Sequence, residues 1–199
     1  MQALIAIDSF KNSMTSIQAN QLVATAFAAH GIQSQQIAIA DGGEGTVAAF
    51  LANQPGGELI TVPTVDLAQR PIQGTYGYFE AKKLAIIEVA AASGIQFLND
   101  GLVPANTNTY GTGLLIKAAI ERGAQQLVIG LGGSGTVDGG AGILRALGYQ
   151  FYDDQQRELM MVGADLGQVT TIKTDAVLPD LAEVLSLIHI SEPTRRSYI

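Results

Sequence analysis

Short apolar runs alternate with polar loops and amphipathic stretches over the first quarter of the chain. The run 3–7 predicts a strand, and a helix is expected after it because Thr15 and Gln18 fit a capping box. A second strand is expected over residues 36–40 and a second helix over residues 46–53. Strand, loop and helix therefore occur twice in this order, which is typical of α/β sheets with parallel strands.

The pattern becomes rich in β-formers from residue 58 and later returns to strand, loop and helix. Antiparallel or mixed pairing is expected for the three β-rich runs, which are 59–65, 72–79 and 84–88. Beyond a loop that ends near residue 106, the pattern predicts a helix, a strand and a helix over residues 112–122, 126–130 and 141–147. The sequence thus predicts an α/β fold.

The last stretch of the chain, residues 186–199, breaks with the composition before it. It contains two adjacent arginines and a proline, and it has no glycine. We interpret it as a translated adaptor or frame-shifted end joined to a truncated gene, with a genuine polar tail as the alternative. On this reading residues 187–199 are expected not to pack on the core.

Composition and charge narrow the classes of function. The 199 residues are 47% hydrophobic, so a sizeable core can form, and 11 Lys and Arg against 18 Asp and Glu give a net charge of −7. A nucleic-acid partner is not expected from such an acidic chain. No apolar run is long enough for a membrane span, and the lack of cysteine is compatible with the cytoplasm. Because histidine occurs only at His30 and His189, an Asp or Glu is the expected proton acceptor.

The loop after the strand at 126–130 is rich in glycine and matches G-x-G-x-x-G over residues 130–135. Read literally, this is a dinucleotide fingerprint with Asp153 as the acid that binds ribose, although residues 136–140 delay the helix that should follow. The second interpretation is a nest of backbone N–H groups that holds phosphate, with hydroxyls of Ser134 and Thr136 as further donors. The third is a tight connection that serves packing alone.

Two other loops carry candidate chemistry. Asp41 and Glu44 lie three residues apart among three glycines, a pattern that suits Mg²⁺, although Glu44 could instead cap the following helix. Asp8 and Lys11 follow the first strand, at the edge where open α/β sheets bind ligands. Lys11 is the only Lys or Arg before Arg70, so it is the candidate cation for this part of the chain.

Five segments together resemble the bacterial glycerate kinase family in order and spacing. They are Asp8–Lys11, Ala40–Thr46, Glu88–Gly94, Tyr110–Gly113, and Gly132–Ser134 with Asp138–Gly142. The resemblance implies ATP-dependent phosphorylation of D-glycerate to 2-phosphoglycerate on a two-domain α/β fold with a Rossmann-like parallel sheet. It also implies a C-terminally truncated chain, because family members are nearly twice as long. Asn12, Gly135 and Val137 depart from the family's usual glycine, alanine and asparagine.

With this resemblance, each candidate residue receives an expected role. Catalysis is assigned to Lys11, Asp41 and Asp138; nucleotide phosphate binding to Gly132, Gly133, Ser134 and Gly135; substrate binding to Asp8, Ser9 and Glu44; and Mg²⁺ binding to Asp41, Glu44 and Asp138. The expected partners are glycerate and ATP. The expected domains are residues 1–95, Rossmann-like with a β-rich insertion, and residues 96–185, a partial second α/β domain. Two rivals stay open: an oxidoreductase that uses Gly130, Gly132, Gly135 and Asp153, and an anion-binding fragment without turnover.

Overall fold

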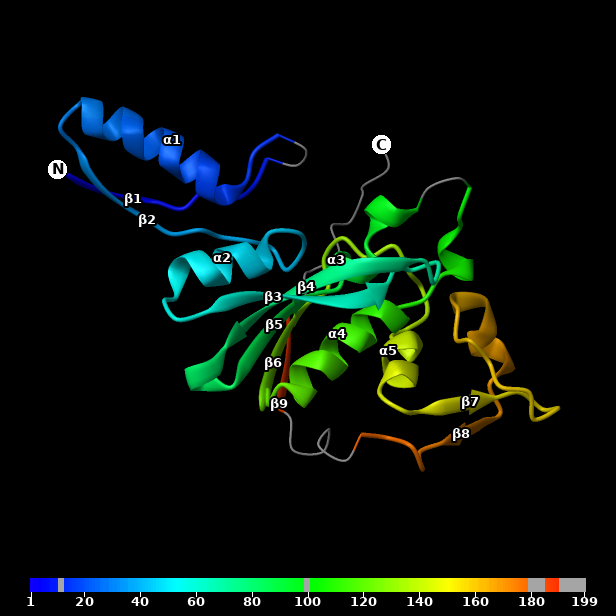
Figure 1. The fold of residues 1–199 in the computed structure, drawn as a ribbon. Coiled ribbons are helices and arrows are strands. Elements are labelled where there is room, and N and C mark those ends of the chain that lie inside the picture. Colours follow the sequence, from blue (N-terminus) through cyan, green and yellow to red (C-terminus); the bar gives the residue numbers. More distant parts are fainter. Residues whose placement is uncertain (11–12, 99–100, 179–184, 190–199) are drawn as a thin grey trace.

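The structure is a computed structural model that describes residues 1–10, 13–98, 101–178 and 185–189. At the N-terminal end, β1 (Gln2–Ile5) and β2 (Gln33–Gln36) pair in parallel, and α1 (Ser16–Ala29) connects them. The capping box predicted for α1 is confirmed, because Thr15 and Gln18 exchange side-chain and backbone hydrogen bonds. This unit, drawn in blue, lies beside α2 (Thr46–Asn53) (Figure 1).

The strand expected over residues 36–40 is wrong, since β2 ends at Gln36. The reason lies in two side chains of α1. The N–H of Ile37 still donates to the carbonyl of Ile5 at 2.9 Å, but the next groups that face β1 bond α1 instead: the carbonyl of Ile37 accepts from Asn20 at 2.8 Å, and the N–H of Ile39 donates to Ser16 at 3.0 Å. On the opposite side of this segment, both backbone groups of Ala38 bond the side-chain amide of Asn53, at 3.0 and 2.6 Å.

The central sheet has five strands in the order β3-β4-β5-β6-β9. The first three pair antiparallel and the last three pair in parallel, so the antiparallel or mixed pairing predicted for the β-rich runs is confirmed. The α/β class is also confirmed, but the sheets are small and mixed and do not form the expected Rossmann-like parallel sheet. The strands come from both sides of residue 95: β3 (Glu58–Val65), β4 (Pro71–Phe79), β5 (Leu84–Glu88), β6 (Gln126–Gly130) and β9 (Leu185–His189).

The last described strand corrects one expectation about the C-terminal stretch. Strand β9 runs parallel to β6, from Leu185 beside Gln126 to His189 beside Gly130. The expectation that residues from 187 onward do not pack on the core is therefore wrong for 187–189. Residues 190–199 lie outside the described residues, and the adaptor origin of this stretch stays a prediction.

Helices cover both faces of the sheet (Figure 1). Ala85 and Ile87 of β5 pack in the cluster with Leu115 of α4 (Tyr110–Glu121), whereas Ile86 packs in the cluster with Val47 of α2. Successive residues of a strand point to opposite faces, so a strand buried on both sides has a continuous apolar run. This explains the uninterrupted hydrophobic sequence of β5.

The rest of the described chain follows α4 and β6. There α5 (Ala141–Ala146) packs against the first turns of α4, where a Cβ at Gly113 would lie 2.6 Å from that of Ala146. The antiparallel pair of β7 (Gln150–Tyr152) and β8 (Thr171–Lys173) comes after it. Short helical turns complete the fold: α3 (Ala90–Ser93), η1 (Glu80–Lys82), η2 (Ile95–Phe97), η3 (Pro104–Asn106) and η4 (Gly163–Gln168). Within the described ranges, no helix combines the length and the apolar character that a membrane crossing requires.

Candidate functional site

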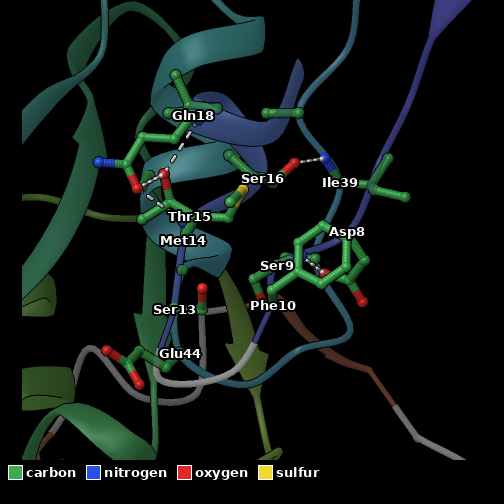
Figure 2. Close-up of a pocket in the computed structure, with 16 residues that line it drawn as sticks. Asp8, Ser9, Phe10, Ser13, Met14, Thr15, Ser16, Gln18, Ile39 and Glu44 are labelled. Carbon is green, nitrogen blue, oxygen red and sulfur yellow. Dashed lines mark hydrogen bonds between the residues drawn. The ribbon is translucent and has the colours of Figure 1, made fainter. Parts of the chain in front are cut away.

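A cavity of about 290 Å³ lies where the first two strand-to-helix loops meet. Its wall comes from the loop before α1, the first turn of α1, the segment after β2 and the start of α2 (Figure 2). The three residues expected to bind substrate, Asp8, Ser9 and Glu44, all line this cavity although 36 positions separate the first from the last. Their role in binding stays a prediction, but the fold brings them together.

Two polar side chains of α1 hold the cavity wall in place. Ser16 donates to the carbonyl of Ile7 at 2.6 Å and accepts from the N–H of Ile39 at 3.0 Å. One turn later, Asn20 accepts from the N–H of Ile7 at 2.9 Å and donates to the carbonyl of Ile37 at 2.8 Å. Both side chains are buried. They replace strand-to-strand hydrogen bonds beyond the ends of β1 and β2, where the cavity lies.

The start of α2 is capped by a residue far away in the sequence. Gly45 is the N-cap residue, has φ of 95° and supplies no side-chain cap. Instead the carboxylate of Glu88, at the end of β5, accepts from the N–H of Val47 at 2.7 Å. Burial raises the pKa of Glu88, and the N–H groups of Val47 and Gly45 oppose that rise. Glu44 is thus not needed as the helix cap, and its exposed side chain lies at the cavity (Figure 2).

The two glycine-rich loops touch each other through their backbones. The N–H of Gly132 donates to the carbonyl of Gly42 at 3.0 Å. A Cβ at Gly130 would lie 2.3 Å from the carbonyl oxygen of Gly42, and one at Gly132 would lie 2.7 Å from the nitrogen of Gly43. Packing therefore requires these glycines, which the fingerprint interpretation had assigned to a dinucleotide. The contact joins the loop 41–45, one end of which lines the cavity, to the loop 130–135.

The phosphate nest expected over residues 132–135 is smaller than predicted. The N–H groups of Gly132 and Gly135 already donate to backbone carbonyls, the latter to Ser93 at 2.8 Å. In the part of the chain that the structure describes, the N–H groups of Gly133 and Ser134 donate to no protein acceptor. Both residues are exposed, and the Ser134 hydroxyl lies 3.0 Å from that of Thr136. Gly133 and Ser134 are therefore the candidate phosphate donors.

The geometry contradicts the dinucleotide rival. Asp153, expected to bind ribose, is 3% exposed and accepts from the guanidinium and the backbone of Arg157 at 2.7 and 2.9 Å. The backbone N–H of Arg157 is the main cause that lowers the pKa of Asp153. In addition, residues 131–140 separate β6 from α5, whereas the fingerprint needs its helix directly at the loop.

The structure does not support the catalytic and metal-binding roles expected for Asp138. This residue is 1% exposed. Its Oδ2 accepts from the N–H and the hydroxyl of Thr109 at 2.8 and 2.7 Å, and from the N–H of Gly142 at 2.9 Å. Its Oδ1 accepts from the N–H of Gly140 at 3.3 Å. Asp138 ties the start of α4 to the start of α5 and has almost no surface for a metal or substrate.

The three carboxylates expected to bind Mg²⁺ do not form one site. Among residues 1–10, 13–98, 101–178 and 185–189, no group of three or more His, Cys, Asp or Glu side chains could hold a metal ion. Asp41 accepts from the N–H of Gly43 at 2.9 Å and shares its loop with Glu44, whereas Asp138 is bound to Thr109. Lys11, the expected catalytic cation, lies outside the described residues.

The sequence matches the Glycerate kinase family over residues 3–191. The chain belongs to the glycerate kinase family. It is 38% identical over 175 residues to a glycerate kinase of Bacillus subtilis, a match that covers 86% of this chain and 46% of that protein. It is 36% identical over 191 residues to the glycerate 2-kinase of Escherichia coli, covering 92% and 49% of the two chains.

A solved structure supports the same fold. The crystal structure of a candidate glycerate kinase 2 from Salmonella typhimurium LT2 matches with a TM-score of 0.82 and 30% identity, covering 94% of this chain and 52% of that one. The chain thus spans about half the length of the glycerate kinase family relatives it matches.

Proposed function

We propose that this chain carries the glycerate-binding site of an ATP-dependent kinase that converts D-glycerate to 2-phosphoglycerate. The observation that carries the proposal is the cavity at which Asp8, Ser9 and Glu44 meet in a member of the glycerate kinase family. Two similar proteins are named glycerate kinase and glycerate 2-kinase.

The cavity offers complementary groups for a small hydroxy acid. The first turn of α1 lines it, and the partial positive charge at a helix N-terminus favours a carboxylate. Asp8 and Glu44 can accept hydrogen bonds from the hydroxyls of glycerate, and Ser9 can donate one. The side chains of Met14 and Ile39 supply apolar wall for the carbon chain (Figure 2).

ATP is proposed to place its phosphates on the other side of the same loop. Glu44 lines the cavity, whereas Gly42 and Gly43 contact the loop that carries Gly133 and Ser134. Asp41 and Glu44 fit Mg²⁺, which takes one or two carboxylates together with water and phosphate oxygens and which, when bound, neutralises phosphate charge. Lys11 is proposed to stabilise the negative charge that develops on the transferred phosphoryl group.

Phosphorus NMR of the chain with D-glycerate, ATP and Mg²⁺ tests the proposal, with 2-phosphoglycerate and ADP as the expected products. The variant Glu44→Gln should lower the rate by about tenfold or more, because it removes a charged acceptor at the cavity. The control Glu58→Gln, which changes an exposed partner of Arg122, should keep the rate. Glycerate binding without any product would instead support the anion-binding fragment, and neither binding nor product would refute both.

A further inference from the structure

Glu88 is a half-buried carboxylate to which the proposed chemistry gives no role. It is the last residue of β5 and lies directly beside Gly130 in the parallel pairing with β6. The loop that starts at Gly130 contacts Gly42 and Gly43. Glu88 therefore lies beside the start of the loop 130–135, which in turn contacts the loop 41–45.

The bonds of Glu88 reach the start of α2 from across the sheet. Its carboxylate accepts from the N–H of Val47 at 2.7 Å, and the N–H groups of Gly45 and Thr46 also stabilise its charge. The first N–H groups of a helix have no partner within the helix, and Gly45 has no side chain that could cap them. Glu88 supplies that cap from 41 positions away.

We propose that Glu88 is a positioning residue that fixes the start of α2, and with it the loop carrying Asp41 and Glu44, against the loop after β6. The proposal rests on the proposed function of the loop 41–45. Glu88 contacts the start of α2 through backbone N–H groups. Position 88 therefore needs a side chain that carries an acceptor oxygen and is long enough to reach these groups. The carboxylate at the start of α2 also means that this helix end is not a free phosphate site.

Two substitutions distinguish the effect of the length of the Glu88 side chain from the effect of its charge. Glu88→Asp keeps the charge but is one methylene too short, whereas Glu88→Gln keeps the length and one acceptor oxygen. Amide hydrogen exchange of the 199-residue chain should be about tenfold faster at residues 45–47 in Glu88→Asp, and close to wild type in Glu88→Gln. The control Asp153→Asn, which alters a buried carboxylate that accepts backbone N–H groups in another turn, should leave residues 45–47 unchanged.

Unchanged exchange at residues 45–47 in Glu88→Asp overturns the proposal, as does faster exchange in Glu88→Gln than in Glu88→Asp. If Glu88→Asp yields no folded protein, fast exchange at these residues in folded Glu88→Gln overturns it and slow exchange supports it.

Turnover provides the second readout, at a temperature at which all variants are folded. The kcat/KM for glycerate should fall about tenfold in Glu88→Asp, recover within a few-fold in Glu88→Gln and stay unchanged in Asp153→Asn. Equal loss in all three variants would indicate a general effect of stability and would overturn the positioning role. If the wild-type chain makes no product, the proposed function fails, and hydrogen exchange still decides the role of Glu88.

Discussion

Substitution of Asp138 should destabilise the fold far more than it affects any bound metal. In Glu- or Asp-based metal sites a carboxylate keeps lone pairs for the ion, but Oδ2 of Asp138 already accepts three hydrogen bonds of 2.7 to 2.9 Å. The partners are Thr109, which precedes α4, and Gly142 in the first turn of α5. Loss of this carboxylate therefore releases the starts of two helices at once.

The magnitude follows from these bonds. In Asp138→Asn the amide oxygen can take the place of Oδ2, so three charge-assisted bonds become neutral ones and each loses about half its strength, for a total of about 2–3 kcal/mol. In Asp138→Ala four donors lose their acceptor, which costs about 4 kcal/mol or more. At about 2–4 °C per kcal/mol for a chain of this size, the Tm of Asp138→Asn should fall by roughly 4–12 °C.

Thermal melts of both variants, each with and without Mg²⁺, provide the assay. The control is Asp41→Asn, an exposed loop carboxylate that accepts from Gly43, which should change stability by about 1 kcal/mol or less. If Asp138→Asn melts within about 2 °C of the wild type and has lost affinity for Mg²⁺, Asp138 does not have this structural role. That result would instead support the Mg²⁺-binding role that the sequence predicts for Asp138.

Three further predictions concern the loops. Gly132→Ala should destabilise by about 1–3 kcal/mol in urea unfolding, because its Cβ would lie 2.7 Å from the nitrogen of Gly43, whereas Gly167→Ala, with nothing within 4 Å, should be neutral; equal stability of the two would contradict the packing role. The pKa of Glu88 is raised above its ordinary value of 4.5, so the folded state holds this proton more tightly than the unfolded state. The stability that this proton provides is present below pH 4.5 and is lost as the pH rises through the raised pKa. Thermal melts over this range should show the loss in the wild type but not in Glu88→Gln. Parallel pH dependence of Tm in the two proteins would contradict this prediction. Lys11→Met should lower kcat/KM for glycerate by about 10²-fold. The control Lys117→Met, which removes a surface partner of Glu121, should leave kcat/KM unchanged. Retained activity in Lys11→Met would show that Lys11 has no catalytic role.

Local patterns predicted the elements whose signals lie within a few residues. The capping box at Thr15 defines the start of α1, and β3, β4 and β5 follow their β-rich runs to within a residue or two. The clustering of Asp8, Ser9 and Glu44 was also predictable, since loops at the ends of parallel strands meet at one edge of a sheet.

Long-range hydrogen bonds determine the features that local sequence patterns do not predict. Asn20 and Ser16 of α1 take the backbone groups through which Ile37 and Ile39 would pair with Ile7, and nothing near residues 37–39 in the sequence shows this. Strand β9 was not predicted because the composition of residues 186–199 differs from that of the chain before them. Its pairing with β6 joins segments that lie far apart in the sequence. Glu88 had one visible signal, an acid that ends an apolar strand, but its partner at the start of α2 depends on the tertiary fold.

If the proposed function is correct, glycerate binds in the cavity between α1 and the loop 41–45. Titration of D-glycerate into the labelled chain, followed by amide NMR shifts, locates the binding site. The shifted amides should cluster at the cavity wall, at Ser9, Thr15 to Gln18, and Glu44 to Gly45. Shifts that leave these residues unchanged and gather elsewhere, such as at the β7–β8 pair, would contradict binding in this cavity.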